Sequence, residues 1–192
     1  MPDPIFETVV TTRSAAGVVH IAPMGVRYVG DDVVLMPFRP STTLANIEAT
    51  GCAVLNLITD VRVFAGCVTG RRDWPTVPVA GFDGVRLAQA LGHVALRLRE
   101  QQDDPQRPVL RMARGAEATH APFRGMNRAQ AAVVEGAVLV SRLHMLPAEK
   151  IDKEMRYLQI AIDKTADTAE LEAWGWLQQA MAQHRAGAKG VA

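Results

Sequence analysis

Four neighbouring residues combine the side chains that proteins use to hold a phosphate group. Ser41, Thr42 and Thr43 place three hydroxyls in a row, directly after Arg39 and a proline. These hydroxyls also suit a helix start, where the first backbone N–H groups lack acceptors and the helix dipole contributes about half a positive charge. An anion fits such a place, and Arg39 would add a charge-assisted hydrogen bond. Composition alone leaves two interpretations open: a phosphate site, or an ordinary helix cap beside a surface arginine.

The common catalytic and metal-binding motifs are missing from the rest of the sequence. The five histidines and two cysteines show no metal-ligand spacing. There is no GxSxG, no P-loop and no GxGxxG between a strand and a helix. We therefore expect no metal site, and we interpret most histidines as structural. His20 stays a candidate because its predicted strand lies beside the hydroxyl-bearing segment.

The first half of the chain reads as strands around one short helix. Pro40 ends the third strand, because proline cannot donate to a ladder, and Gly51 fits a helix C-cap, so a short helix is expected from Ser41 to about Ala49. Residues 61–68 fit either a helix or a strand, and the glycine- and proline-rich residues 70–84 are expected to be a loop. Alternating and β-branched residues predict strands over 5–13, 18–29, 33–38, 52–60, 91–100 and 108–113.

From Asn127 onward the hydrophobic period becomes helical. Asn127 suits the N-cap of a helix reaching about Leu143, Pro147 suits the start of a second, and Thr168 suits the cap of a third. The second helix has an apolar stripe at helical spacing. The sequence thus predicts an antiparallel β module up to about residue 125, followed by three helices.

Composition narrows the class of protein. The 192 residues are 48% hydrophobic and 21% charged, as in one globular domain with or without an appendage. Lys+Arg minus Asp+Glu is 21 − 20 = +1, so no global field attracts nucleic acid or an anionic membrane. Apolar runs are far shorter than the ~20 residues of a membrane span. With two cysteines and no basic or apolar signal in Met-Pro-Asp-Pro, we expect a cytoplasmic protein.

Several segments together resemble one family. They read ETVVTT, H-x-APMGV, PFRPSTT-x-x-N and VLNLITD, followed by NRAQAAVVEGAVLVSRL and LPAEKIDKE in the helical part. These motifs are similar to those of the domain of unknown function 447 family, within the flavin-binding split-barrel superfamily. The resemblance covers most of the chain. It implies an α+β fold, mainly antiparallel β: an FMN-binding-type split β-barrel over residues 1–125 and a C-terminal helical subdomain over 126–192.

The same resemblance implies FMN as the cofactor and points to candidate binding residues. Residues 22–25 would run beside the isoalloxazine, and the missing side chain of Gly25 would let the ring approach backbone amides. Phe38 would pack under the ribityl chain or the ring edge, or belong to the core. Asn46 and Asn56 would bond ribityl hydroxyls or cap local backbone. The candidate cofactor-binding residues are His20, Ala22, Pro23, Met24, Gly25, Phe38, Arg39, Ser41, Thr42, Thr43, Asn46 and Asn56.

The function implied is that of an FMN-dependent oxidoreductase, with no catalytic residue assigned, because the flavin performs the redox chemistry. The family occurs alongside tetrahydromethanopterin-linked one-carbon metabolism, so a small pterin-type substrate is expected. Related split-barrel oxidases carry a lysine in the turn that holds the FMN phosphate. The first lysine of this chain is Lys150, which counts against oxidase activity. A homodimer with flavin near its interface is expected, without nucleic-acid or membrane partners. The alternatives are a non-catalytic flavin-binding or carrier protein, and a structural partner protein without flavin.

Overall fold

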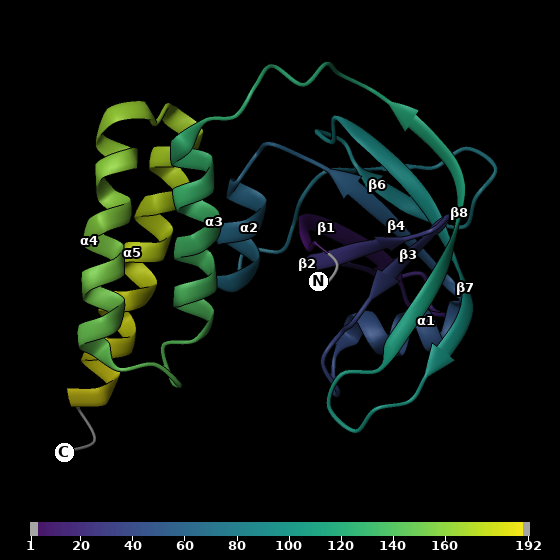
Figure 1. Ribbon diagram of the computed structural model, residues 1–192, viewed down its shortest axis with the longest axis horizontal. Coiled ribbons are helices and arrows are strands. Elements are labelled where there is room, and N and C mark those ends of the chain that lie inside the picture. The colour runs from purple at the N-terminus through teal and green to yellow at the C-terminus, as the bar shows by residue number, and fades with distance from the viewer. Residues whose placement is uncertain (1–3, 190–192) are drawn as a thin grey trace. The chain divides into compact units, whose positions relative to one another are not determined.

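A computed structural model describes residues 4–189 and divides the chain into two compact units (Figure 1). The first unit comprises the chain up to Ile58 together with Asp73–Phe123. The second comprises Thr59–Arg72 together with the chain from Arg124 onward. The sequence places the boundary at residues 125 and 126. In the structure, Thr59–Arg72 also groups with the C-terminal helices, although it lies in the middle of the chain.

The first unit contains a closed barrel of six antiparallel strands, in the order β1-β2-β3-β8-β7-β4 (Figure 1). Strand β4 closes the ring by pairing with β1 on one side and β7 on the other. The mainly antiparallel α+β fold expected from the sequence is confirmed. The barrel strands are β1 (Phe6–Arg13), β2 (Val19–Val29), β3 (Asp32–Leu35), β4 (Cys52–Leu57), β7 (Gly92–Gln102) and β8 (Val109–Thr119).

Alternate residues of these strands build the barrel core. Val10 of β1 lies opposite Leu55 of β4, which lies opposite Val94 of β7. All three are buried members of one hydrophobic cluster. Because successive side chains point to opposite faces of a strand, the same register sends Val9 and Asn56 to the outer face of the barrel.

Helix α1 (Thr42–Thr50) begins and ends where the sequence predicts. Ser41 is its N-cap: the backbone is extended, with φ −154° and ψ 150°, and the side chain accepts a hydrogen bond from the Leu44 N–H. Gly51 ends the helix in the left-handed region, with φ 67°, which glycine adopts without a steric penalty. Leu44 and Ile47 lie on one face of the helix and belong to the barrel core.

A small sheet lies where the sequence predicts a loop. Strand β5 (Thr76–Pro78) pairs with β6 (Val85–Leu87), and the strand pattern is hidden by Pro75 and Pro78 and by the glycines between the two strands. The Thr11 hydroxyl of β1 donates to the Val85 carbonyl oxygen. Val54 of β4 packs so closely against Gly84 that a Cβ there would come within 2.8 Å of it. The sheet is therefore attached to the outer face of β1 and β4.

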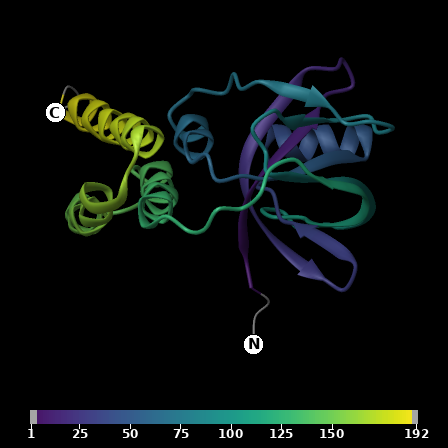
Figure 2. The same cartoon turned by 90° about the horizontal axis from the view of Figure 1, so that it is seen from above.

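The second unit consists of helices, of which α3 and α4 are seen nearly end-on in Figure 2. Asn127 caps α3, and its backbone N–H donates to the Gln130 side chain. Gly136 lets α3 and α5 approach closely, because a Cβ there would lie 2.8 Å from the Trp174 ring and 3.1 Å from Leu177. The helices are α2 (Arg62–Val68), α3 (Arg128–Ser141), α4 (Ala148–Thr165) and α5 (Thr168–Lys189).

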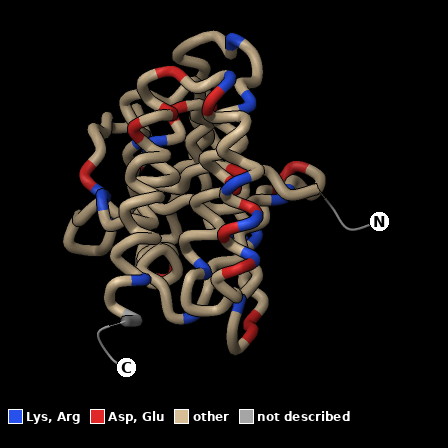
Figure 3. The backbone as a smooth tube through the Cα atoms, turned by 90° about the vertical axis from the view of Figure 1, so that its left-hand side faces the viewer, with Lys and Arg blue, Asp and Glu red and all other residues tan. Residues whose placement is uncertain are grey.

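The surface of the helical unit carries both signs of charge. Acidic and basic positions are interspersed along its helices (Figure 3), and Lys150 forms an ion pair with Glu154 one turn further along α4. Arg185 of α5 pairs with Asp152 of α4. Over residues 4–189, no helix is both long enough and apolar enough to cross a bilayer.

Candidate functional site

The segment between β3 and α1, residues 36–41, contains much of the predicted phosphate site, and we call it the phosphate turn. Pro37 and Pro40 lie within it and have no backbone N–H. The segment therefore cannot continue the ladder of β3, which ends at Leu35 and not at Phe38 as predicted. Its backbone needs hydrogen-bond partners from elsewhere in the fold.

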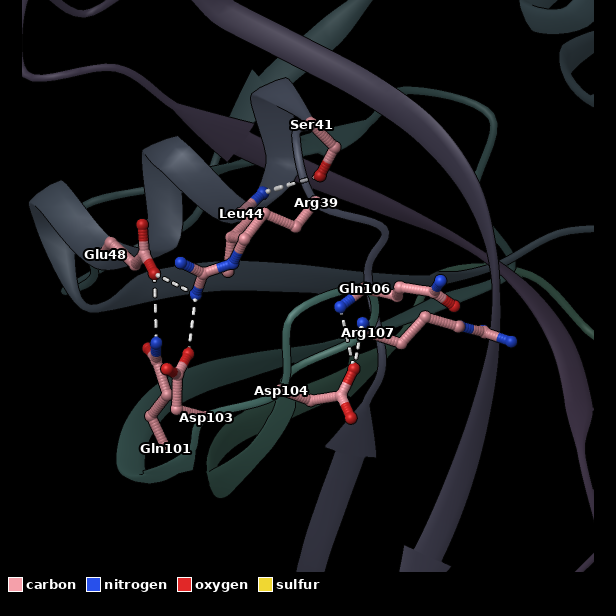
Figure 4. A network of polar contacts seen from close by, with 9 residues as sticks. All are labelled: Arg39, Ser41, Leu44, Glu48, Gln101, Asp103, Asp104, Gln106 and Arg107. Atoms are coloured by element: carbon pink, nitrogen blue, oxygen red, sulfur yellow. Dashed lines mark hydrogen bonds and ion pairs between the residues drawn. The ribbon is translucent and has the colours of Figure 1, made fainter.

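The tip of the β7–β8 hairpin, residues 103–107, supplies those partners (Figure 4). The Arg39 N–H donates to the Gln106 carbonyl oxygen over 2.8 Å. The guanidinium of Arg107 donates to the Met36 carbonyl oxygen, with N···O distances of 3.0 and 3.3 Å. The hairpin tip thus bonds the backbone of the phosphate turn at two points, Met36 and Arg39.

The first turn of α1 leaves two backbone donors for a ligand. Among the described residues, the amide N–H groups of Thr42 and Thr43 find no acceptor, whereas those of Leu44 and Ala45 donate to Ser41. Thr42 is exposed, Ser41 is half-buried and Thr43 is 2% exposed. Unpaired N–H groups at the positive end of a helix favour an anion. The helix start therefore offers two amides and an exposed hydroxyl to a phosphate.

The Arg39 guanidinium lies along the flank of α1, beside Glu48, and not at the helix start (Figure 4). Its Nη2 is 3.0 Å from Asp103 Oδ1 and 3.5 Å from Glu48 Oε1. The same Glu48 oxygen accepts a hydrogen bond from Gln101 Nε2 at 2.9 Å. Two carboxylates therefore share this guanidinium, whose side chain is 39% exposed.

Asp104 shapes the hairpin tip. Its Oδ1 accepts hydrogen bonds from the backbone N–H groups of Arg107, at 2.6 Å, and Gln106, at 2.8 Å, and these bonds lower the pKa of the carboxyl. The Arg107 guanidinium also lies 4.6 Å from the centre of the Phe38 ring. Phe38 is 64% exposed, so its interpretation as a core residue is wrong. Asp103-Asp104-Pro105 has the residue types of a turn, but the sequence gives no signal that this turn meets the phosphate turn.

The predicted flavin-ring strand, residues 22–25 of β2, pairs with β1 and is half-buried. Met24 packs against the barrel core, so its neighbours Pro23 and Gly25 face away from the core. A Cβ at Gly25 would lie 2.7 Å from Ile5 Cγ2. The missing side chain therefore makes room for Ile5 here, and its role toward a flavin ring stays a prediction.

His20 and Asn46 meet at Thr12 of β1. Thr12 lies opposite His20 in the β1–β2 ladder, and its hydroxyl accepts a hydrogen bond from Asn46 Nδ2 at 3.0 Å. Asn46 is buried on α1, and His20 is half-buried. The structure thus brings these two candidates to one place, one helical turn beyond the start of α1.

Asn56 is fully buried, and its side chain bonds within the protein. Its Nδ2 lies 3.1 Å from the Val9 carbonyl oxygen, 3.2 Å from the Val54 carbonyl oxygen and 3.2 Å from Thr11 Oγ1. Its Oδ1 accepts a hydrogen bond from the Leu87 N–H at 2.7 Å. These bonds join β1, β4 and β6, and they support the interpretation in which Asn56 satisfies backbone groups.

Two histidines that the sequence does not mark as functional form a pair at the base of the β7–β8 hairpin. His93 Nδ1 lies 2.8 Å from His120 Nε2, and the parallel rings, 2° apart in orientation, have centres 5.0 Å apart. Rings so placed lie head to head, as in an N–H···N hydrogen bond in which one imidazole donates and the other accepts. His93 is 7% exposed, and burial lowers its pKa, with His120 and Arg86 adding to the effect. Burial and Arg86 also lower the pKa of His120.

The closed antiparallel barrel, with the capped helix α1 packed on it, has the split-barrel fold. The chain belongs to the family of proteins of unknown function DUF447. The model of the family's N-terminal domain matches residues 6–121, and that of its C-terminal region matches residues 127–179. No curated protein matches the sequence.

Solved structures share this fold at low sequence identity. The FMN-bound protein MM1853 of Methanosarcina mazei, of the same family, is 20% identical with a TM-score of 0.80, over 93% of this chain and 96% of that one. The 2-nitrobenzoate 2-nitroreductase of Pseudomonas fluorescens is 22% identical with a TM-score of 0.53, over 62% and 66%. Flavoredoxin of Methanosarcina acetivorans is 12% identical with a TM-score of 0.52, over 62% and 69%. These likenesses establish the fold.

Proposed function

We propose that the chain binds FMN and is an FMN-dependent oxidoreductase. The observation that supports this most strongly is the start of α1, where the amides of Thr42 and Thr43 have no acceptor beside an exposed hydroxyl. A protein of the same family, MM1853, is FMN-bound, and a nitroreductase and a flavoredoxin share the fold. A helix start that suits a phosphate, in a fold shared with flavin proteins, makes FMN the best-supported ligand.

The residues present fit a flavin mononucleotide. The helix start would hold the phosphate through two amides and the Thr42 hydroxyl, with Arg39 in the adjoining turn. The half-buried backbone of residues 22–25 is a candidate neighbour of the ring, and His20 and Asn46 are candidates near the ribityl chain. When bound, FMN supplies the transfer of electrons in ones or twos. The protein's part is to hold the flavin in one place and to shield one side of it from water.

Within this proposal the substrate is a small molecule of the pterin type, as in one-carbon metabolism. The resemblance of the sequence motifs supports this assignment. Assays with flavin reduced by NADH or NADPH, followed by a pterin acceptor, test it. Turnover that depends on both the flavin and the pterin is expected, whereas electron transfer to oxygen alone contradicts the substrate assignment.

We further propose a cytoplasmic homodimer with the flavin near the interface, as the split-barrel resemblance implies. Sedimentation velocity of the flavin-loaded protein would then give twice the 20.8 kDa chain mass. A monomer with full flavin content contradicts the dimer without affecting the flavin site.

The first test of the flavin site is an absorbance spectrum of the purified protein, with any released cofactor identified by mass. A titration with FMN and with riboflavin, which lacks the phosphate, then isolates the contribution of the helix start. Thr42 occupies the first helical position, where proline is tolerated, and Ser41 already has the extended backbone that a following proline requires. Thr42→Pro therefore removes one amide donor while preserving the helix.

We expect Thr42→Pro, which removes both the amide and the hydroxyl of Thr42, to weaken FMN binding by about tenfold or more and to leave riboflavin binding unchanged. Thr42→Ala keeps the amide and serves as the matched control, with a smaller loss. Equal affinity of the wild type for FMN and riboflavin would contradict the phosphate site. A protein that binds FMN without turnover is the carrier alternative, and one that binds no flavin is the structural alternative.

A further inference from the structure

We propose that Asp103 and Glu48 are positioning residues of the flavin phosphate site, and that Arg39 serves the phosphate by fixing the helix start, without touching it. The inference rests on the FMN site proposed above. It adds the tip of the β7–β8 hairpin, more than 60 residues along the chain, to that site.

The hairpin tip supports the backbone of the phosphate turn. With prolines at two of its positions, the turn has few donors of its own, and the Arg39 N–H is bonded to the Gln106 carbonyl oxygen. Arg107 caps the other end of the turn at the Met36 carbonyl oxygen. The position of Ser41, and so the direction of the two free amides that follow it, depends on the hairpin tip.

The Arg39 side chain lies between α1 and the hairpin tip. Its guanidinium is bonded to Glu48, seven residues after Ser41 and ~10 Å along the helix axis at 1.5 Å per residue. Asp103 holds the same Nη2 atom from the hairpin side (Figure 4). Arg39 therefore clamps the second turn of α1 to the hairpin. Direct contact with a phosphate at the helix start would require both ion pairs to break.

The charged side chains around Arg39 do not attract a phosphate as a group. The network contains three carboxylates, Glu48, Asp103 and Asp104, and two guanidinium groups, Arg39 and Arg107. Its formal charge is 2 − 3 = −1, so its side chains add no net attraction for a phosphate. Attraction then comes from the amides and the helix dipole, which act over short range and need an accurately placed helix.

The experiment compares FMN and riboflavin dissociation constants for the wild type, Arg39→Ala, Asp103→Asn and the double variant. Exposed ion pairs of this kind contribute modestly, so we expect each single variant to weaken FMN binding about three- to fivefold. The double variant should be no weaker than Arg39→Ala alone, because both changes remove one contact. Riboflavin affinity should stay unchanged and Tm should fall by no more than a few degrees, which distinguishes positioning of the phosphate site from general destabilisation. Asp103→Glu should restore much of the FMN affinity.

Glu48→Gln is a second variant on the helix side and should weaken FMN binding in the same direction. Asp31→Asn is the matched control, because it removes one exposed carboxylate of the same unit that lies outside the network. Unchanged or tighter FMN binding by Asp103→Asn, with a large loss in Arg39→Ala, would overturn the inference and make Arg39 a direct ligand. A wild type that binds neither flavin would instead overturn the proposed function itself.

Discussion

The two ends of the β7–β8 hairpin are held by opposite kinds of contact. At the base, His93 bonds His120 through neutral imidazoles, and it lies opposite the fully buried Asn56 in the ladder. At the tip, Asp103 bonds Arg39 across a solvent-exposed surface. Buried neutral bonds are costly to break, whereas exposed ion pairs contribute little and respond to salt and ligands.

The base and the tip of the β7–β8 hairpin therefore have different roles. The base contributes stability, because removing a partner there leaves a buried polar group unsatisfied. The tip positions the phosphate turn through its contacts, and these contacts add little to the free energy of unfolding. Mutations at the base should therefore change unfolding, and mutations at the tip should change ligand binding.

The largest expected effect is at the base. Asn56→Ala leaves the Leu87 N–H without its acceptor and removes the amide from three further oxygens. We expect the free energy of unfolding to fall by about 2–3 kcal/mol, measured by urea denaturation. Asn46→Ala is the comparison, since within residues 4–189 its amide donates to Thr12 alone, and it should lose less than half as much. Similar losses for both would contradict a special structural role of Asn56.

A smaller effect at the base depends on pH. The pKa values of His93 and His120 are lowered from 6.5 in the folded protein, so below pH 6.5 the unfolded chain binds more protons than the folded one. Stability therefore falls with decreasing pH, and it is fully present above pH 6.5. We expect Tm to drop by a few degrees between pH 7.5 and 5.5.

His93→Gln should flatten this pH dependence, and the exposed His144→Gln is the control that should leave it intact. If the pH dependence of Tm survives in His93→Gln, the imidazole pair is not its source.

The next largest expected effect is a salt-dependent loss of stability at the tip of the hairpin. Asp103→Asn should lower the free energy of unfolding by less than about 1 kcal/mol, because its side chain is 81% exposed. The difference from the wild type should shrink further in 1 M NaCl, where the Debye length is about 3 Å. A salt-independent difference would place the Arg39 pair among buried contacts and remove the contrast with the base.

The smallest expected effect is local. Asp104→Ala removes the acceptor for the Gln106 and Arg107 amides, so these two amides should exchange with deuterium faster while Tm hardly changes. Amides of β7 near His93 serve as the internal reference. Faster exchange along the whole hairpin would show that tip and base behave as one cooperative unit.

The sequence predicts well those features that depend on residues close together in the chain. Ser41 and Gly51 mark the ends of α1 because capping depends on residues within one turn of the helix end. The contact of Arg39 with Asp103 joins residues 64 positions apart, and the imidazole pair spans 27. Both depend on the β7–β8 register, which shifts twice along the hairpin, and no pattern of residue types encodes such shifts.

Other differences have physical reasons of their own. Strand β5 contains Pro78 and follows Pro75, residues that normally speak against a strand, so the sequence indicates a loop there. Phe38 looks like a core residue at the end of an apolar run, yet the preceding Pro37 takes it out of the ladder. The sequence thus predicts where α1 begins but not that the hairpin tip contacts the residues before it.

The assignment of Thr59–Arg72 to the second unit has a practical consequence for cutting the protein into parts. The chain passes between the units three times, so one proteolytic nick in residues 124–127 releases the C-terminal helices but leaves α2 covalently joined to the barrel. A truncated gene ending at residue 125 would still encode α2, whose Val63, Phe64 and Cys67 are buried in the intact chain. Such a fragment would expose an apolar helix and aggregate. An isolable barrel instead calls for replacing residues 59–72 with a short polar linker as well as removing the C-terminal helices.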